Sequence, residues 1–263
     1  KTLGDYNLIN AAMYPLGAPI AIFVFFTAFF AMKSAALLAE GHFNWRFLFQ
    51  SPQFAPKSER RNLKKNTEGI LRIWKRFIFI SACAIFGIEF YQYLFATFSF
   101  GPFIKAWLFS PYIYIFTNLL GISAQCLFLL TREIPSDIHN HPYLSRSISE
   151  FWGRRWNLWV SDWLATLSKK ASPTNEKRRF LWAFTLSGIF HEVIAALPYY
   201  MSTGQNYFGL MTSFFIIQYF AVALDKKVLK SAHPALRASF MWLSIIAPMP
   251  LFINPSVTAF FGV

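Results

Sequence analysis

Charged side chains are scarce in this sequence, and their scarcity restricts the classes of protein to which the chain can belong. Only 14% of the 263 residues are Asp, Glu, Lys or Arg, whereas 55% are hydrophobic and 20% are aromatic. A soluble domain carries about a quarter charged residues. The composition therefore argues against any soluble domain and predicts a chain embedded in a membrane.

Cysteine is nearly absent as well, because the sequence holds only Cys83 and Cys126. Both lie inside apolar runs, and their separation fits neither a metal site nor a disulfide framework. The sequence shows no internal repeat and no low-complexity stretch. It begins at Lys1 rather than at Met. We expect a single membrane domain over residues 1–263 that lacks some N-terminal part.

Long apolar runs are what the sequence does contain. Residues 106–130 carry no charge, and residues 180–224 carry only Glu192. A helix needs about 20 apolar residues to cross a ~30 Å hydrocarbon core, since each residue adds about 1.5 Å. We therefore predict an all-α, polytopic transmembrane helical bundle with about six or more spans. The expected spans are roughly 11–38, 77–99, 103–130, 180–201, 207–224 and 238–260.

Basic residues gather in the segments between these spans. Of the 25 Lys and Arg residues, nine lie in 46–76, nine in 132–179 and four in 226–237. Pairs of spans separate the three segments, so the positive-inside rule places all three in the cytoplasm. The charge of +13 then suits anionic lipid headgroups or an anionic ligand, and no nucleic-acid partner is expected. We expect an integral multi-pass protein, of the endoplasmic reticulum in a eukaryote or of the inner membrane in a bacterium.

The segment 150–165 differs from an ordinary loop because it is rich in tryptophan, at positions 152, 156, 159 and 163. The spacing would place all four rings on one face of a helix, which Ser149 would cap. We predict an amphipathic interfacial helix there, with its aromatic face at the membrane boundary. Asn157 would lie on this helix, either bonding a carbonyl or hydroxyl group or serving as an ordinary surface amide.

His191 lies in the middle of the expected span 180–201. An ionisable group at that depth is costly, and it is therefore a functional candidate by default. Ser187 and Gly188 precede it by one turn, where small side chains would either leave an opening beside the imidazole or allow close helix packing. Glu192 lies about 100° from His191 around the helix, so we expect it to meet another span or a buried basic group.

A neutral histidine in a dry cavity can remove a proton from a hydroxyl group. If an activated ester reaches the same cavity, the hydroxyl oxygen can attack it, which is acyl transfer. Together with Glu192, the same histidine would suit a proton-coupled transporter, so the residues alone leave both classes open. A metal is not expected, because the five histidines form no cluster and His139 and His141 lack a third nearby ligand.

Two motifs decide between these classes through resemblance. Residues 142–157 read Pro-Tyr-Leu-Ser-Arg-Ser-Ile-Ser-Glu-Phe-Trp-Gly-Arg-Arg-Trp-Asn. They resemble the signature of the wax synthase-like branch of the membrane-bound O-acyltransferase superfamily. Residues 186–192, Leu-Ser-Gly-Ile-Phe-His-Glu, resemble the second motif of that family. The two motifs occur in the same order along the chain, and at the same separation, as in that family.

The resemblance implies a helical bundle around a reaction tunnel, in which acyl-CoA as co-substrate meets a hydrophobic alcohol. By position, His191 is the expected general base, Asn157 the residue that positions a substrate or steadies the thioester carbonyl, and Glu192 a supporting group. No permanently bound cofactor and no metal are expected. The acceptor stays open among a fatty alcohol, diacylglycerol, a sterol and a terpenoid alcohol. The expected substrate-binding residues are Trp152, Arg154, Arg155, Trp156, Ser187, Gly188 and Glu192.

Overall fold

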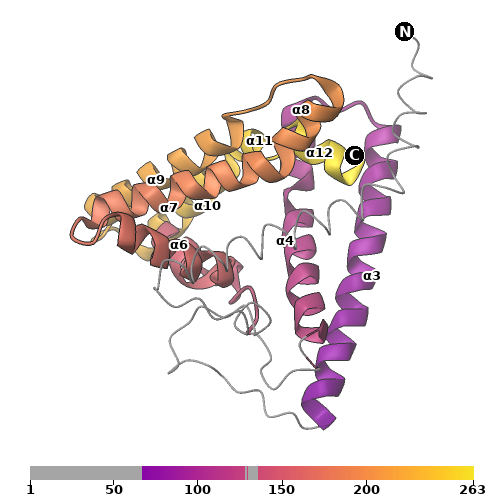
Figure 1. Ribbon diagram of the computed structural model, residues 1–263, viewed down its shortest axis with the longest axis horizontal. Helices are drawn as coiled ribbons and strands as arrows, with labels where there is room; N and C mark the ends of the chain where they lie inside the picture. The colour runs from indigo at the N-terminus through magenta and orange to yellow at the C-terminus, as the bar shows by residue number, and fades with distance from the viewer. Residues whose placement is uncertain (1–66, 128, 130–135) are drawn as a thin grey trace.

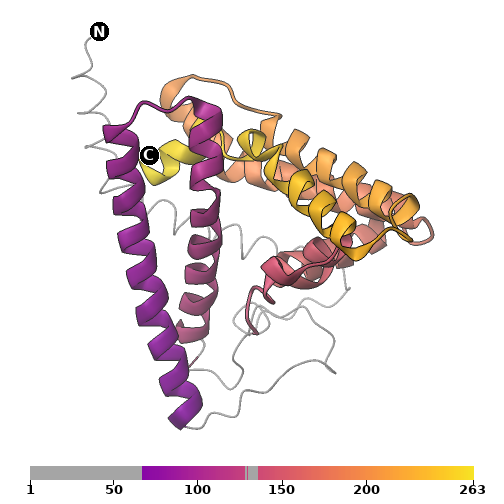
Figure 2. The ribbon, with the colours of Figure 1, turned by 180° about the vertical axis from the view of Figure 1, so that it is seen from behind.

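The computed structural model describes residues 67–127, 129 and 136–263 (Figures 1 and 2). Every regular element among these residues is a helix or a helical turn, which confirms the predicted all-α class for the described part of the chain. The elements are α3 (Thr67–Thr97), α4 (Pro102–Leu127), the 3-10 turn η3 (Pro142–Leu144), α5 (Ile148–Glu150), the π-helical turn η4 (Phe151–Arg155), α6 (Leu158–Ala171), α7 (Glu176–His191), the π-helical turn η5 (Glu192–Ala196), α8 (Leu197–Thr203), α9 (Leu210–Lys227), α10 (Pro234–Ile246), α11 (Met249–Phe252) and α12 (Pro255–Phe261).

One arm of the molecule is the pair α3 and α4, which run side by side in opposite directions (Figure 1). Gly87 allows the pair to approach closely, because a Cβ atom there would lie 3.1 Å from the ring of Tyr112. The Tyr112 hydroxyl donates a hydrogen bond to the carbonyl oxygen of Ala84 at 3.0 Å. Aromatic rings fill the rest of the interface, as with Tyr91 and Phe109 at 5.2 Å between centroids.

The second arm contains α7, α9 and α10, with α5 packed against α9 and α10 and with α6 packed against α7 (Figures 1 and 2). The short helix α11 contacts both α4 and α9, and α12 contacts α8 and η5. The C-terminal elements therefore join the two arms. The largest buried cluster of this arm consists of Ile148, Phe151, Phe184, Phe214, Phe215, Ala221, Val222, Met241 and Ile245.

Three helical segments among the described residues are long and apolar enough to cross a membrane: 68–97, 176–203 and 234–252. The second runs from α7 through η5 into α8 without a break. By length and composition, the structure supports a membrane protein with several spans. It does not confirm the six expected spans, one of which, 11–38, lies outside the described residues.

Physical reasons account for the differences in span number and position. The helix expected at 77–99 begins at Thr67, so the basic residues Arg72, Lys75 and Arg76 lie on α3 rather than in a loop. α4 contains Pro111 and several polar side chains, while α9 has only 18 residues and ends in Asp-Lys-Lys. Both are helices as expected, but neither is among the candidate spans.

Candidate active site

The signature segment does not form one continuous helix. Ser147 caps α5, since its hydroxyl oxygen accepts a hydrogen bond from the backbone N–H of Glu150 at 3.1 Å. The chain then makes the turn η4, and the backbone of Trp156 is extended. Asn157 follows with a φ of 41°, in the left-handed region, and caps α6. The predicted single helix is therefore wrong, because the backbone breaks at Trp156 and Asn157.

The break also separates the four tryptophans, which do not share one face. Trp152 and Trp156 precede it and pack against the core of the second arm. Trp159 and Trp163 follow it on α6, where each is only 7% exposed. The aromatic face predicted at the membrane boundary is not present, because these rings fill interior contacts instead.

Asn157 holds its turn through two hydrogen bonds. Its Oδ1 accepts from the N–H of Val160 at 3.4 Å, as an N-cap side chain does. Its own backbone N–H donates to Nδ1 of His139 at 3.1 Å. Its Nδ2 makes no hydrogen bond with any residue that the structure describes. The amide of Asn157 therefore keeps a donor available while its oxygen fixes the helix end.

The two arginines of the signature have different surroundings. Arg155 Nε donates to Glu150 Oε1 at 2.6 Å, and its Nη1 lies 3.3 Å from the carbonyl oxygens of Asn140 and His141. Arg154 is exposed, and within the described residues its guanidinium has neither a hydrogen bond nor an ion pair. Of the two arginines expected to bind a substrate, only Arg154 has a guanidinium without a partner among the described residues.

The Glu150 carboxylate keeps Arg155 in place. Burial alone would raise the pKa of this carboxyl group. The hydrogen bonds from the Arg146 N–H and from Arg155 oppose burial, and the pKa of Glu150 is lowered in balance. The carboxylate is thus ionised at neutral pH, and it binds Arg155 as a structural ion pair.

α9 ties the signature segment to α10 through Gln218, which is fully buried. Its Oε1 accepts from Trp152 Nε1 at 3.2 Å, and its Nε2 donates to the carbonyl oxygen of Ser244 at 2.9 Å. One end of this side chain therefore holds Trp152, and the other end holds α10. The role predicted for Trp152 in substrate binding stays a prediction, and the structure shows its ring partly buried against the core of the second arm.

A second buried tie from α9 is Asp225, which is 0% exposed. It forms two 2.9 Å hydrogen bonds with Arg237 and lies 3.5 Å from the hydroxyl of Ser149. Sequence reasoning assigned Arg237 to a solvated basic loop and Ser149 to a helix cap, and it missed Asp225 and Gln218. The available signal was their separation of seven residues, two helical turns, on an otherwise apolar helix.

His191 is the last residue of α7 and is partly buried. Its Nδ1 lies 2.7 Å from the carbonyl oxygen of Ser187, one turn earlier. A carbonyl oxygen only accepts, so Nδ1 carries a proton and, in the neutral imidazole, Nε2 keeps its lone pair. The rings of Phe215 and Phe252 lie 4.9 and 5.1 Å from the imidazole, centroid to centroid. The result is a basic nitrogen within an aromatic shell.

The small residues beside His191 serve packing and orientation. A Cβ atom on Gly188 would lie only 2.6 Å from the Cα atom of Thr212, so Gly188 allows α7 and α9 to pack closely. Of the two alternatives for this glycine, close helix packing applies. Ser187 supplies the carbonyl oxygen that orients the imidazole of His191.

Glu192 points away from His191 and binds the beginning of α9. Its Oε1 accepts hydrogen bonds from the backbone N–H groups of Gly209 and Thr212, both at 3.0 Å. A helix N-terminus favours a negative charge, because its first N–H groups have no partner within the helix. The expectation that Glu192 meets a second helix is therefore confirmed.

Ring contacts connect the two motifs, although no direct contact joins Asn157 to His191 in the described residues. From His191 the ring contacts pass to Phe215 at 4.9 Å and on to Trp152 at 5.8 Å. They continue to Phe151 at 5.0 Å and end at Trp156, which is stacked on Phe151 at 5.5 Å. The reaction tunnel that the resemblance implies stays a prediction.

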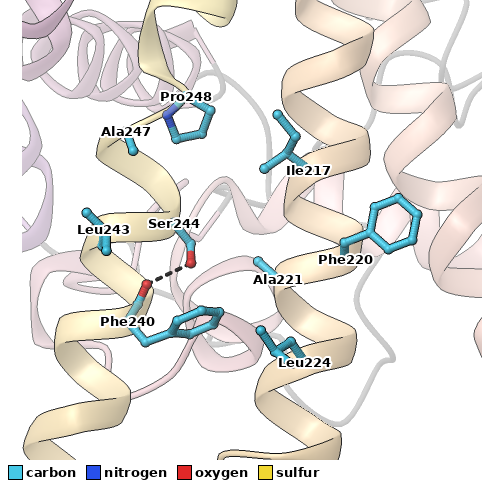
Figure 3. A pocket seen from close by; sticks show the side chains of 9 residues that line it. All are labelled: Ile217, Phe220, Ala221, Leu224, Phe240, Leu243, Ser244, Ala247 and Pro248. Carbon is cyan, nitrogen blue, oxygen red and sulfur yellow. Dashed lines mark hydrogen bonds between the residues drawn. The ribbon is translucent and has the colours of Figure 1, made fainter.

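A groove of about 440 Å³ lies between α9 and α10 (Figure 3). Its one hydroxyl, that of Ser244, donates to the Phe240 carbonyl oxygen of its own helix. A second hollow, of about 350 Å³, lies among the α3–α4 turn, the start of α9 and the C-terminal elements. Neither is lined by His191 or Asn157. The groove in Figure 3 is lined by Ile217, Phe220, Ala221, Leu224, Phe240, Leu243, Ser244, Ala247 and Pro248.

No metal site is visible in the described part of the chain, where no three His, Cys, Asp or Glu side chains gather. His139, which sequence reasoning assigned to a polar loop, is instead 7% exposed and bonded at both ring nitrogens. Nothing in the sequence around it distinguished it from His141, which is exposed.

Comparison with known proteins gives one family match, to the membrane bound O-acyl transferase family over residues 135–217. The matched segment contains the signature, α6, α7 with His191, and the first half of α9. It therefore includes every site residue that the sequence predicted.

Three relatives illustrate the similarity. The long-chain-alcohol O-fatty-acyltransferase of Simmondsia chinensis is 33% identical over 108 residues, 37% of this chain and 30% of the relative. The probable long-chain-alcohol O-fatty-acyltransferase 8 of Arabidopsis thaliana is 26% identical over 174 residues, 62% of this chain and 49% of the relative. Diacylglycerol O-acyltransferase 1 of Dictyostelium discoideum is 26% identical over 155 residues, 58% of this chain and 23% of the relative.

The matched parts cover half or less of these relatives' own lengths. No solved structure matches the chain. The family match and the relatives confirm the predicted resemblance to the membrane-bound O-acyltransferase superfamily and its wax synthase-like branch, which the family match places at residues 135–217.

Proposed function

We propose that the protein transfers an acyl group from acyl-CoA to the hydroxyl group of a hydrophobic alcohol. The relatives' names describe acyl transfer to long-chain alcohols and to diacylglycerol, and they favour this activity over the transporter alternative. The observation that carries the proposal is the bond from His191 Nδ1 to the Ser187 carbonyl oxygen, because it leaves Nε2 free to accept a proton.

In the proposed reaction, Nε2 of His191 takes the proton from the alcohol hydroxyl. The alcohol oxygen attacks the thioester carbonyl carbon, and a carbon–oxygen bond forms. The carbon–sulfur bond then breaks, and the leaving thiolate takes the proton back from the imidazolium. The products are an ester and CoA with a free thiol, and the imidazole returns to its starting state.

Asn157 is proposed to stabilise the negative charge that develops on the thioester oxygen. Its Oδ1 is used in capping α6, so Nδ2 is the group that can donate to that oxygen. Its fixed left-handed backbone supports this role, because a preorganised donor does not have to reorient during the reaction.

The donor is proposed to approach from the basic end of the second arm, on the cytoplasmic side. Arg154 is free and exposed, and other exposed cations, which lie before α5 and on α6 and α7, can attract the phosphates of CoA. The other exposed cations are Arg146, Lys169, Lys170, Lys177 and Arg178.

We propose a long-chain alcohol as the acceptor, with diacylglycerol as the alternative acceptor. The proposed location is the endoplasmic reticulum or the inner membrane.

The test is ester formation by the purified, detergent-solubilised protein. It would be given labelled acetyl-CoA or palmitoyl-CoA with hexadecanol, diacylglycerol, a sterol or a terpenoid alcohol. His191→Ala should lower turnover by about 10²–10⁴-fold, the usual contribution of a general base. His233→Asn is the matched control, because His233 is an exposed helix cap and Asn keeps that cap.

The proposal would be supported if wild type and His233→Asn formed ester while an equally folded His191→Ala formed little. Full turnover by His191→Ala would remove His191 from the mechanism. A well-folded wild type that makes no ester from any pair of substrates would contradict acyl transfer by this chain.

A further inference from the structure

A short segment, Ser136–Asn140, lies along the turn that contains Asn157, and we name it the bracing segment. The N–H of Asn140 donates to the Arg155 carbonyl oxygen at 2.8 Å, and the N–H of Leu158 donates to the Ile138 carbonyl oxygen at 2.8 Å. At its other end, the indole N–H of Trp159 donates to the Ser136 carbonyl oxygen at 3.1 Å. Three bonds thus hold both sides of the turn.

The opposite side of the bracing segment rests on one face of α4. Thr117, Gly121 and Gln125 are spaced by four residues and therefore share that face. A Cβ atom on Gly121 would lie 2.7 Å from Ile138 Cγ2, so the glycine allows the segment to lie directly on the helix. Gln125 Nε2 donates to Asp137 Oδ1 at 3.1 Å.

Asp137 extends the connection to the other helix of that arm. Arg76 on α3 donates to the same carboxylate oxygen, Oδ1, at 2.9 Å. This ion pair is about half exposed, so it contributes little on its own. The bracing segment therefore bridges the α3–α4 arm and the turn at Asn157.

His139 lies at the centre of this bridge, with both ring nitrogens occupied. Nδ1 accepts the backbone N–H of Asn157 at 3.1 Å, so in the neutral ring Nε2 carries the proton. Nε2 donates to Thr117 Oγ1 at 2.8 Å, and that hydroxyl donates in turn to the Ile113 carbonyl oxygen at 2.8 Å. Burial lowers the pKa of His139 to about 4, so the ring is neutral at neutral pH.

Aromatic rings fix the plane of the imidazole. The centroid of Trp156 lies 4.5 Å from that of His139, and the centroid of Tyr114 lies 5.2 Å away. The ring therefore has little freedom to rotate away from Asn157. Its only bonding partner on the turn is the backbone of Asn157, while its other partner belongs to α4.

We propose that His139 is a positioning residue that holds the backbone of Asn157 in its left-handed turn and so aims the Asn157 amide. The proposal rests on the function proposed for Asn157. A left-handed φ is unfavourable for a residue with a side chain, because its Cβ atom crowds the following carbonyl oxygen. An N–H of Asn157 without an acceptor would favour another backbone conformation, and Nδ2 would then point elsewhere.

The experiment compares three variants in the ester assay. His139→Leu removes both hydrogen bonds and should lower kcat by about 10–100-fold, because a misplacement of about 1 Å costs up to about 10²-fold. The KM for acyl-CoA should stay within about twofold. His139→Asn places a side-chain oxygen near the position of Nδ1 and should recover much of the loss. Thr117→Val breaks only the bond to α4 and should cost less than His139→Leu.

A double mutant separates positioning from a general structural role. Asn157→Gly removes the amide but keeps the backbone N–H and the left-handed turn, which glycine adopts freely. In that background, His139→Leu should lower turnover by less than about threefold further, because the group that it positions is gone. The same 10–100-fold loss in both backgrounds would overturn the proposal.

Amide hydrogen exchange gives a readout that does not depend on activity. In His139→Leu, peptides covering residues 155–160 should exchange at least about tenfold faster, while peptides of α9 should not change. Unchanged exchange at 155–160 would overturn the positioning role even if the protein makes no ester. Absence of ester from wild type, together with faster exchange in the variant, would contradict the proposed function and leave the positioning geometry supported.

Discussion

The two motifs of the site are held in place by different kinds of interaction. The turn at Asn157 is fixed by hydrogen bonds to the bracing segment and by an ion pair between Arg155 and Glu150. Within the described part of the chain, the His191 side chain has one hydrogen bond, to the backbone of its own helix, and its ring contacts are with aromatic side chains. Polar bonds fix the direction of a backbone, whereas packing fixes the distance between helices.

This difference suits the tasks proposed for the two residues. A donor such as the Asn157 amide must point in one direction, so a bonded turn is the appropriate support. A base such as His191 needs a free nitrogen in a dry environment, which a surrounding of phenylalanine rings provides. The comparison can be tested by changes that remove polar support in one region and packing in the other.

The largest effect is expected from breaking the buried ion pair under the signature segment. Arg237→Met should lower the free energy of unfolding by about 3–5 kcal/mol, because it leaves the carboxylate of Asp225 buried without its partner. Lys226→Met, the control, breaks an exposed pair with Glu176 and should cost less than about 1 kcal/mol. Unfolding in mixed detergent micelles would measure both variants. Equal losses of unfolding free energy in the two variants would contradict the burial of the Asp225 carboxylate.

The second largest effect is expected from acid, which should weaken the hydrogen-bonded turn at Asn157. His139 has a pKa of about 4 in the folded protein, against 6.5 for the unfolded chain, because burial disfavours its charged form. Between these values the unfolded chain binds more protons, so stability falls as the pH drops from 6.5 to 4. The loss attributable to His139 should reach about 3 kcal/mol, at about 1.4 kcal/mol per pKa unit.

The same unfolding experiment at several pH values checks this expectation. The difference in stability between wild type and His139→Leu should shrink as the pH falls through that window. The nearby carboxylate of Asp137 opposes the effect of burial, since it favours the charged imidazole. A difference that stays constant from pH 7 to pH 4 would mean that His139 is not buried in its neutral form.

The packing region should show a smaller effect at Gly188. Gly188→Ala places a Cβ atom 2.6 Å from the backbone of Thr212, so α7 and α9 must move apart, at a cost of about 1–3 kcal/mol. Gly101→Ala is the control, because no atom lies within 4 Å of a Cβ atom there. Denaturation in micelles would compare the two variants. If Gly188→Ala left the free energy of unfolding unchanged, the close contact between α7 and α9 would be refuted.

Sequence patterns predicted the two motifs well, and they failed where tertiary contacts set the backbone. The scarcity of charge and the long apolar runs indicated helices that can cross a membrane. The spacing of the four tryptophans indicated one helix, and this was wrong because the bracing segment offers the Asn157 N–H an acceptor outside the helix. The sequence left two alternatives open at Gly188, and close packing applies because α9 occupies the space beside this glycine.

Sequence by itself determined the helical class, the apolar character of the chain, the position of His191 within a helix and the family that the two motifs resemble. These follow from composition, periodicity and residue order, which do not depend on distant contacts. Tertiary structure alone decided which polar groups are paired. Asp225 with Arg237, Glu192 with the start of α9, and His139 with Asn157 are brought together from separate segments by the packing of helices.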